Sequence, residues 1–143
     1  MSRDLHDLPV SILLALLIWG ESRGEPVEGQ VAVACVVRNR VLRLSHDWRA
    51  VILAPWQFSC FNADDPNAVK VQRAADVLMT GALTPALAQA LWIAEGVIAG
   101  AVIDNTGGAK NYLTTALLQS RPPSWAVDRP ILARIGAHSF LTA

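Results

Sequence analysis

The segment Trp19-Gly20-Glu21-Ser22-Arg23-Gly24-Glu25-Pro26 contains the residues whose types and spacing are best suited to chemistry. Glu21 follows an apolar run, Ile12 to Trp19, and a glycine-rich turn begins directly after it. Apolar surroundings disfavour the charged form of a carboxyl group and raise its pKa, which makes it a useful proton donor near neutral pH. The same pattern also fits an ion pair between Glu21 and Arg23 at a helix end, and the segment alone favours that simpler interpretation.

The cysteine and histidine residues do not form a metal-binding pattern. His6 and His46 do not cluster with His138 in the sequence, and Cys35 and Cys60 form no C-x-x-C pair, so no metal and no cofactor are expected. Cys35 lies in V-A-V-A-C-V-V, a setting typical of a buried thiol. Two free thiols are favoured over a disulfide. His138 lies in an alternating run near the chain end, where a hydrogen-bonded structural role is favoured over acid–base chemistry.

Five helices are expected to position these residues. The first begins after an N-cap at Asp7, with Pro9 in its first turn. The segment from Val27 is long for a strand, which favours a helix although composition leaves both open. Proline and glycine residues mark the other helix ends. The predicted helices span Leu8–Trp19, Val27–Leu44, Trp48–Ala54, Asn67–Thr80 and Pro85–Ala99, the last capped by Thr84.

The C-terminal third has a different character from the helical part. It contains Gly107-Gly108, Pro122-Pro123 and Pro130 with short apolar runs between them, a pattern that indicates loops and short strands. The strands are expected near Lys110–Leu113 and His138–Leu141. The sequence therefore predicts an α+β domain that is mainly α.

Composition excludes several classes of protein. The chain has 143 residues, which is the size of one domain, residues 1–143. Because 52% of the residues are hydrophobic and 17% are charged, the chain is not disordered. The 12 basic and 12 acidic residues cancel, and there is no basic stripe for nucleic acid. The apolar run ending at Trp19 is shorter than the roughly 20 residues that span a bilayer, so no stable membrane insertion is expected.

Several separated motifs resemble one known family. Residues 21–40 read E-S-R-G-E-P-V-E-G-Q-V-A-V-A-C-V-V-R-N-R, where the family has E-A-R-G-E-x-x-x-G-Q-x-A-V-A-x-V-x-x-N-R. Gln57-Phe58-Ser59, the Thr106-Gly107-Gly108-Ala109 run before Tyr112, and the run Ile135 to Phe140 follow in the family's order. Over about residues 19–140, the chain resembles the SleB-like cell-wall hydrolases, a spore-cortex-lytic type also found in phages.

The resemblance implies a lysozyme-like fold, related to goose-type lysozymes, lytic transglycosylases and resuscitation-promoting factors. It places the catalytic acid on Glu21. The implied reaction cleaves the MurNAc–GlcNAc β-1,4 bond of peptidoglycan as a lytic transglycosylase, which forms 1,6-anhydro-MurNAc ends with a single acid/base. The alternatives are a hydrolytic muramidase, with Glu25, Glu28 or Asp104 as second carboxylate, and a non-catalytic wall-binding or virion structural module. Glu25 is expected to cap the next helix.

Weaker roles fall on residues in the other motifs. Gln57 and Ser59 are candidates to hydrogen-bond a sugar, and Thr106 and Tyr112 are candidates to line the cleft, where a glycine-rich loop allows close approach. Packing or turn support is an equal alternative for each. Asn39 and Arg40 are expected to tie helices together.

The expected partners are peptidoglycan glycan strands, and the chain is expected to be a monomer. No signal peptide is recognisable, because acidic residues share the n-region and no small-residue cleavage site follows. The chain resembles a phage or prophage endolysin. Such a protein is made in the cytoplasm and acts on the wall from the periplasm, or as part of the virion. A separate holin would release an endolysin.

Overall fold

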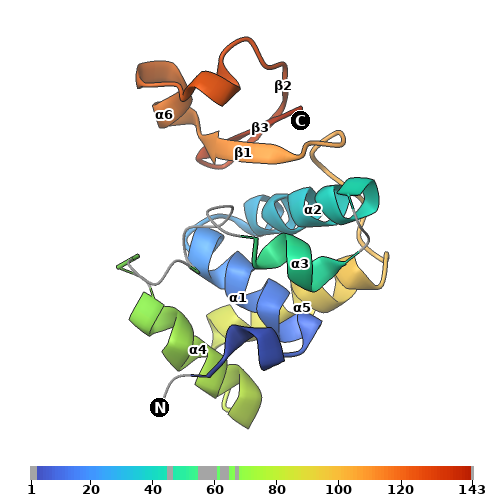
Figure 1. Ribbon diagram of the computed structural model, residues 1–143, viewed down its shortest axis with the longest axis vertical. Helices are drawn as coiled ribbons and strands as arrows, with labels where there is room; N and C mark the ends of the chain where they lie inside the picture. The colour runs from blue at the N-terminus through green and yellow to red at the C-terminus, as the bar shows by residue number, and fades with distance from the viewer. Residues whose placement is uncertain (1–2, 45–46, 55–60, 62–64, 67, 143) are drawn as a thin grey trace.

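The computed structural model describes residues 3–44, 47–54, 61, 65–66 and 68–142. A helical part forms the lower two thirds of Figure 1, and a small sheet with short helices lies above it. Helix α2 lies between this sheet and the other long helices. The elements in chain order are η1 (Leu5–Asp7), α1 (Val10–Ser22), α2 (Val27–Leu44), α3 (Trp48–Ile52), α4 (Ala68–Thr80), α5 (Pro85–Ile98), β1 (Asn111–Thr114), α6 (Thr115–Ser120), η3 (Ser124–Ala126), β2 (Ile131–Ile135) and β3 (His138–Leu141).

Helix α1 is the centre of the hydrophobic core. Every residue from Ile12 to Ile18 is buried, and the helix contacts α2, α3, α4 and α5. A helix that is apolar on all sides is stable only when other elements surround it. Its last turn, which carries Glu21, is therefore fixed by the packing of the whole helical part.

Both predicted ends of this first helix were wrong. Asp7 ends η1 instead of capping α1, and the N-cap of α1 is Pro9. Proline keeps the preceding residue out of the helical region, and Leu8 is extended, with φ −79° and ψ 147°. At the other end the helix continues through Gly20 to Ser22, because a single glycine lowers helix stability by only about 1 kcal/mol and does not end a helix by itself.

The other helices follow the prediction closely. Helix α2 has the predicted bounds, and α4 and α5 end within one residue of them. The Thr84 hydroxyl accepts a hydrogen bond from Leu87 N–H at the start of α5, as expected for an N-cap. Helix α3 begins after a cap at Asp47 and ends at Ile52, shorter than predicted.

Three antiparallel strands form one sheet in the order β1-β3-β2. Tyr112 pairs with Phe140 across β1 and β3. Phe140 is fully buried and belongs to the helical core, so the central strand joins the sheet to the helices. The predicted strands β1 and β3 are present, each within one residue of its predicted bounds.

No single helix in the described ranges is long and apolar enough to cross a membrane. Helices α4 and α5 reach the required length and composition only as a pair, and the chain bends by 75° between them.

Candidate active site

Glu21 lies in the last turn of α1 and is half-buried. The next residue, Ser22, is buried and donates its hydroxyl to the Ile18 carbonyl at 2.7 Å. Arg23 closes the helix end: its Nη1 donates to the carbonyls of Trp19 and Gly20, at 3.1 and 3.4 Å. The Gly20 carbonyl is one of those that a helix C-terminus leaves without a backbone partner, whereas the Trp19 carbonyl also accepts from the Arg23 backbone N–H at 3.3 Å. Glu21 thus stands on an ordered helix end.

The guanidinium of Arg23 also lies 4.3 Å above the ring centroid of Trp19. A cation over an indole face is attracted by the negative face of the ring. The ion pair with Glu21, which the sequence offers as the simpler role for Arg23, stays a prediction. The hydrogen bonds of Arg23 to the helix-end carbonyls give it a capping role that the sequence alone did not indicate.

Glu25 ties the turn after Glu21 to the sheet. Its Oε1 accepts from the Ala137 backbone N–H at 2.7 Å and contacts His138 Nδ1 at 3.0 Å. The side chains of His138 and Glu25 are only 12% and 16% exposed. We call these three residues the Glu25 clamp. The prediction that Glu25 caps the following helix was wrong, because its carboxylate is used on the β2–β3 turn. The structural role predicted for His138 is confirmed.

Gly136 makes the Glu25 clamp sterically feasible. Its φ is +56°, a conformation that L-residues with a side chain rarely adopt. A Cβ atom at this position would lie 2.6 Å from Glu25 Oε1. The carboxylate therefore occupies the space that a side chain at Gly136 would need.

Tyr112 lies beside the Glu25 clamp. Its ring meets the His138 ring edge-on, with centroids 5.4 Å apart and an interplanar angle of 83°. It also contacts the Phe140 ring at 5.9 Å. The structure therefore brings Tyr112, from β1, to the hairpin that Glu25 holds. Its predicted contact with a sugar stays a prediction.

The loop from Asp104 to Gly108 is organised around a carboxylate. Asp104 Oδ1 accepts from the backbone N–H and hydroxyl of Thr106, at 2.8 and 2.6 Å, and Oδ2 accepts from Gly108 N–H at 2.9 Å. Asn39 Nδ2 donates to Oδ2 at 3.1 Å. Burial raises the pKa of Asp104, but the hydrogen bonds from Thr106, Asn39 and Gly108 outweigh it and lower the pKa overall.

Thr106 has a supporting position in this loop. Its side chain is fully buried, and its hydroxyl also accepts from Ala109 N–H at 3.1 Å. A hydroxyl that is buried, with its hydrogen donated to Asp104, does not face solvent. Of the two roles considered for Thr106, cleft lining and turn support, the structure favours turn support.

Asn39 and Arg40 connect α2 to the loop and to β1. Asn39 Nδ2 donates to the Ala109 carbonyl at 2.8 Å, and Arg40 Nε donates to the Lys110 carbonyl at 2.6 Å. Arg40 Nη2 donates to Asn111 Oδ1 at 3.0 Å. The two residues were expected to join helices. They do tie elements together, but they join α2 to the loop before β1 and to β1 itself, not to another helix.

Three further candidates remain: Glu28, Gln57 and Ser59. Glu28 is exposed, and its backbone carbonyl accepts from Asn105 Nδ2 at 3.0 Å. Gln57 and Ser59 lie outside the described residues. Across the described ranges, no three histidine, cysteine or acidic side chains gather as a metal site would require.

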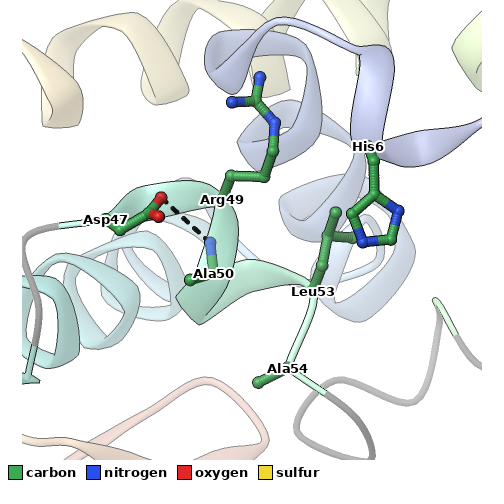
Figure 2. A pocket seen from close by; sticks show the side chains of 6 residues that line it. All are labelled: His6, Asp47, Arg49, Ala50, Leu53 and Ala54. Atoms are coloured by element: carbon green, nitrogen blue, oxygen red, sulfur yellow. Dashed lines mark hydrogen bonds between the residues drawn. The ribbon is translucent and has the colours of Figure 1, made fainter.

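A pocket of about 420 Å³ lies near the N-terminus, and none of the predicted site residues lines it. Figure 2 shows that the guanidinium of Arg49 points away from His6 and Leu53. It donates to the Leu8 carbonyl at 2.6 Å. Asp47 accepts from Ala50 N–H as the cap of α3. The Arg49 and Asp47 contacts support the junction of η1 and α3, so we do not place the site here.

A mostly helical domain with a small sheet, and a carboxylate at the end of its buried helix, defines a protein of the lysozyme-like class. Residues 24–141 match the model of the cell wall hydrolase family, and the chain belongs to this family. The matched residues begin after Glu21.

Curated relatives give the same result. The chain is 32% identical over 130 residues, 90% of its length, to a spore cortex-lytic enzyme of Bacillus cereus, and it covers 42% of that protein. A shorter match, 62% identical over 29 residues, links 20% of the chain to 10% of the spore cortex-lytic enzyme of Bacillus subtilis. The chain thus spans less than half the length of these relatives.

Two solved structures are similar over almost the whole chain. The catalytic domain of the Bacillus cereus SleB protein superposes with a TM-score of 0.64 at 30% identity, covering 93% of this chain and 89% of that one. The catalytic domain of the germination-specific lytic transglycosylase SleB from Bacillus anthracis gives 0.67 at 29% identity, covering 93% of both chains. The predicted family and fold class are confirmed.

Proposed function

We propose that this chain cleaves the MurNAc–GlcNAc β-1,4 bond of peptidoglycan as a lytic transglycosylase, with Glu21 as its single acid and base. Membership of the cell wall hydrolase family supports peptidoglycan as the substrate. The similarity to a structure described as a lytic transglycosylase supports the reaction type.

The observation that carries the single-carboxylate mechanism is the use of the other acidic residues. Hydrolysis by two carboxylates needs a partner at about 5–5.5 Å for retention or about 6.5–9.5 Å for inversion. Glu25 is held by Ala137 and His138, and Asp104 by the loop that it organises. Both carboxylates therefore serve as hydrogen-bond acceptors within the fold, which favours a mechanism that needs only Glu21.

In the proposed reaction Glu21 first donates its proton to the glycosidic oxygen while the bond from that oxygen to C1 of the muramoyl sugar breaks. The muramoyl C6 hydroxyl then attacks C1 and closes a 1,6-anhydro ring, and Glu21 accepts the hydroxyl proton. The glutamate returns to its starting state and no water is consumed. A group that gives and regains a proton works best when its pKa lies near the working pH.

We further propose that the chain serves as a phage or prophage endolysin. The support is the motif resemblance to a family type that also occurs in phages. In this setting the protein is made in the cytoplasm and reaches the wall through a holin. Expression of the chain alone should then leave cells intact, and co-expression with a holin should lyse them. Lysis at the same rate without the holin would contradict this setting.

Replacing Glu21 by glutamine tests the catalytic assignment. The Glu21→Gln variant keeps the size of the side chain, but the amide cannot donate or accept the proton in the reaction. Clearing of purified sacculi should therefore be abolished, while the unfolding transition stays unchanged. Glu95→Gln is the matched control, because Glu95 is an exposed carboxylate on α5 with no proposed role, and it should clear sacculi normally. Equal clearing by Glu21→Gln and the unmodified chain would remove Glu21 from the mechanism. An unmodified chain inactive on every peptidoglycan would favour a binding module.

A further inference from the structure

A second pocket, of about 290 Å³, lies where the end of α1 meets α4 and the start of α5. Its floor is apolar and comes from all three helices: Trp19, Ala74, Val77 and Leu87. Ala74 and Leu87 are buried, whereas Trp19 and Val77 are half-buried and present apolar surface to the pocket. We call this pocket the Trp19 groove.

Cations form the rim of the Trp19 groove. Lys70 and Arg73 line it from α4, one helical turn apart, and both are exposed. Among the described residues neither one has a carboxylate partner. Arg23 does not line the groove, but its guanidinium lies 4.3 Å from the ring centroid of Trp19, which does.

Acidic residues are absent from the described lining of the groove. The acidic residue of α4, Asp76, does not line it and pairs with Arg3 at 2.6 Å. The chain as a whole has no net charge, so the groove is a local concentration of positive charge around an apolar floor. Such a surface is complementary to a ligand that has carboxylates next to small apolar groups.

The position of the groove relative to Glu21 limits what it can bind. Trp19 and Glu21 are two residues apart on α1, which places them about 200° apart around the helix and about 3 Å apart along its axis. A glycan strand at Glu21 would therefore not lie in the groove. A branch that leaves the strand near the cleaved bond could pass around the helix end and reach it.

We propose that the Trp19 groove binds the stem peptide of peptidoglycan, with Lys70 and Arg73 receiving its carboxylates. The stem peptide is the carboxylate-bearing branch of this polymer, and its alanine methyl groups suit an apolar floor. This inference rests on the proposed function, since it takes the glycan strand to lie at Glu21. The groove makes the chain favour strands that still bear peptides over bare glycan.

The test compares a double variant, Lys70→Gln with Arg73→Gln, with a control, Arg43→Gln with Arg121→Gln. The control removes the same charge from exposed positions outside the groove. Two substrates are used: peptidoglycan with its stem peptides, and glycan strands stripped of peptide by an amidase. On the first, the groove variant should cleave about threefold to tenfold more slowly, the range expected for two partly exposed ion pairs. On stripped strands the groove variant should cleave at the same rate as the unmodified chain. The control variant should cleave both substrates at the rate of the unmodified chain. Equal slowing on both substrates, or no slowing on either, would overturn the proposal.

A binding measurement separates this proposal from the proposed function. Soluble N-acetylmuramoyl-tripeptide is titrated into the chain, and backbone amide shifts are followed by NMR. Saturable shifts are expected in α4 and at the start of α5, with affinity at least threefold weaker in the groove variant and unchanged in the control. Failure to bind, or equal binding by the groove variant, would overturn the groove assignment even if the chain cleaves peptidoglycan. Binding without any cleavage would contradict the proposed function alone.

Discussion

Replacing Gly136 by alanine tests whether the Glu25 clamp holds the end of α1 to the sheet. A Cβ at this position would lie 2.6 Å from Glu25 Oε1, and 3.2 Å from both Glu25 Cδ and Pro26 Cδ. The φ of +56° is also unfavourable for alanine. The substitution therefore acts in two ways: it strains the backbone, and it displaces the carboxylate from Ala137 and His138.

The two effects have different magnitudes. The left-handed backbone costs alanine about 1 kcal/mol. Hydrogen bonds to charged groups contribute about 1.5–3 kcal/mol to stability. Because Glu25 is partly exposed, breaking the Glu25 clamp is expected to lower the free energy of unfolding by about 2 kcal/mol. The total destabilisation expected for Gly136→Ala is about 3 kcal/mol, which most domains of this size survive.

Gly81 provides the matched control. Its φ is +81°, but a Cβ there would meet no atom within 4 Å. Gly81→Ala should therefore cost only the backbone strain, about 1 kcal/mol. Denaturant unfolding followed by tryptophan fluorescence gives both values, and clearing of sacculi gives the activity. Gly136→Ala should lose more stability and more activity than the control.

A double-mutant cycle identifies the source of the difference. In a Glu25→Ala background the carboxylate is absent and only the 3.2 Å approach to Pro26 Cδ remains, so Gly136→Ala should cost clearly less than it does in the unmodified chain. Equal destabilisation by Gly136→Ala and Gly81→Ala, or an unchanged cost in the Glu25→Ala background, would refute the reasoning.

The other predictions concern the loop, the thiol and the α2 anchor. Asp104→Asn should destabilise the chain at neutral pH by about 1–3 kcal/mol, because it removes a charged acceptor. The hydrogen bonds lower the pKa of Asp104 below its ordinary 3.8. The carboxylate therefore adds its full share to the free energy of unfolding above that pH, and this share is lost as the pH falls through the folded-state pKa. When unfolding is measured against pH, the Asp104→Asn variant should lose less stability in acid than the unmodified chain. Burial raises the pKa of the Cys35 thiol, so in a Cys60→Ser chain a thiol reagent should label it only after denaturation, and rapid labelling of the folded chain would contradict its burial. Arg40→Lys should cost about 1–2 kcal/mol in denaturant unfolding, because lysine cannot donate to both the Lys110 carbonyl and Asn111 in the same geometry; an unchanged midpoint would show that this anchor contributes little.

The features predicted correctly from the sequence depend on local signals. The length of the Val27–Leu44 run favoured a helix for α2, and Thr84-Pro85 marks the start of α5 within a few residues of chain. The helix-end position of Glu21 follows from the apolar run before it and the glycine-rich turn after it. These signals are contained in short windows, so no tertiary contact is needed to interpret them.

The Glu25 clamp could not be predicted in this way. Glu25 and His138 are 113 residues apart in the chain, and nothing local to Glu25 distinguishes a helix cap from a distant hydrogen bond. Gly136 was the available signal, since a glycine between two strands marks a turn that another group can approach closely. Strand β2 was missed because most of its residues are exposed and do not alternate clearly between apolar and polar. Helix α6 was missed because it has only 6 residues and follows β1 directly, which is too short a run to show helical periodicity.

Mass spectrometry of sacculi digested by the unmodified chain, before and after borohydride reduction, tests the central claim most directly. A lytic transglycosylase with Glu21 as its single acid and base leaves 1,6-anhydro-muramoyl ends, which have no reducible carbon and do not change on borohydride treatment. Muramic acid ends that borohydride reduces would show that water attacked C1, and would contradict the account.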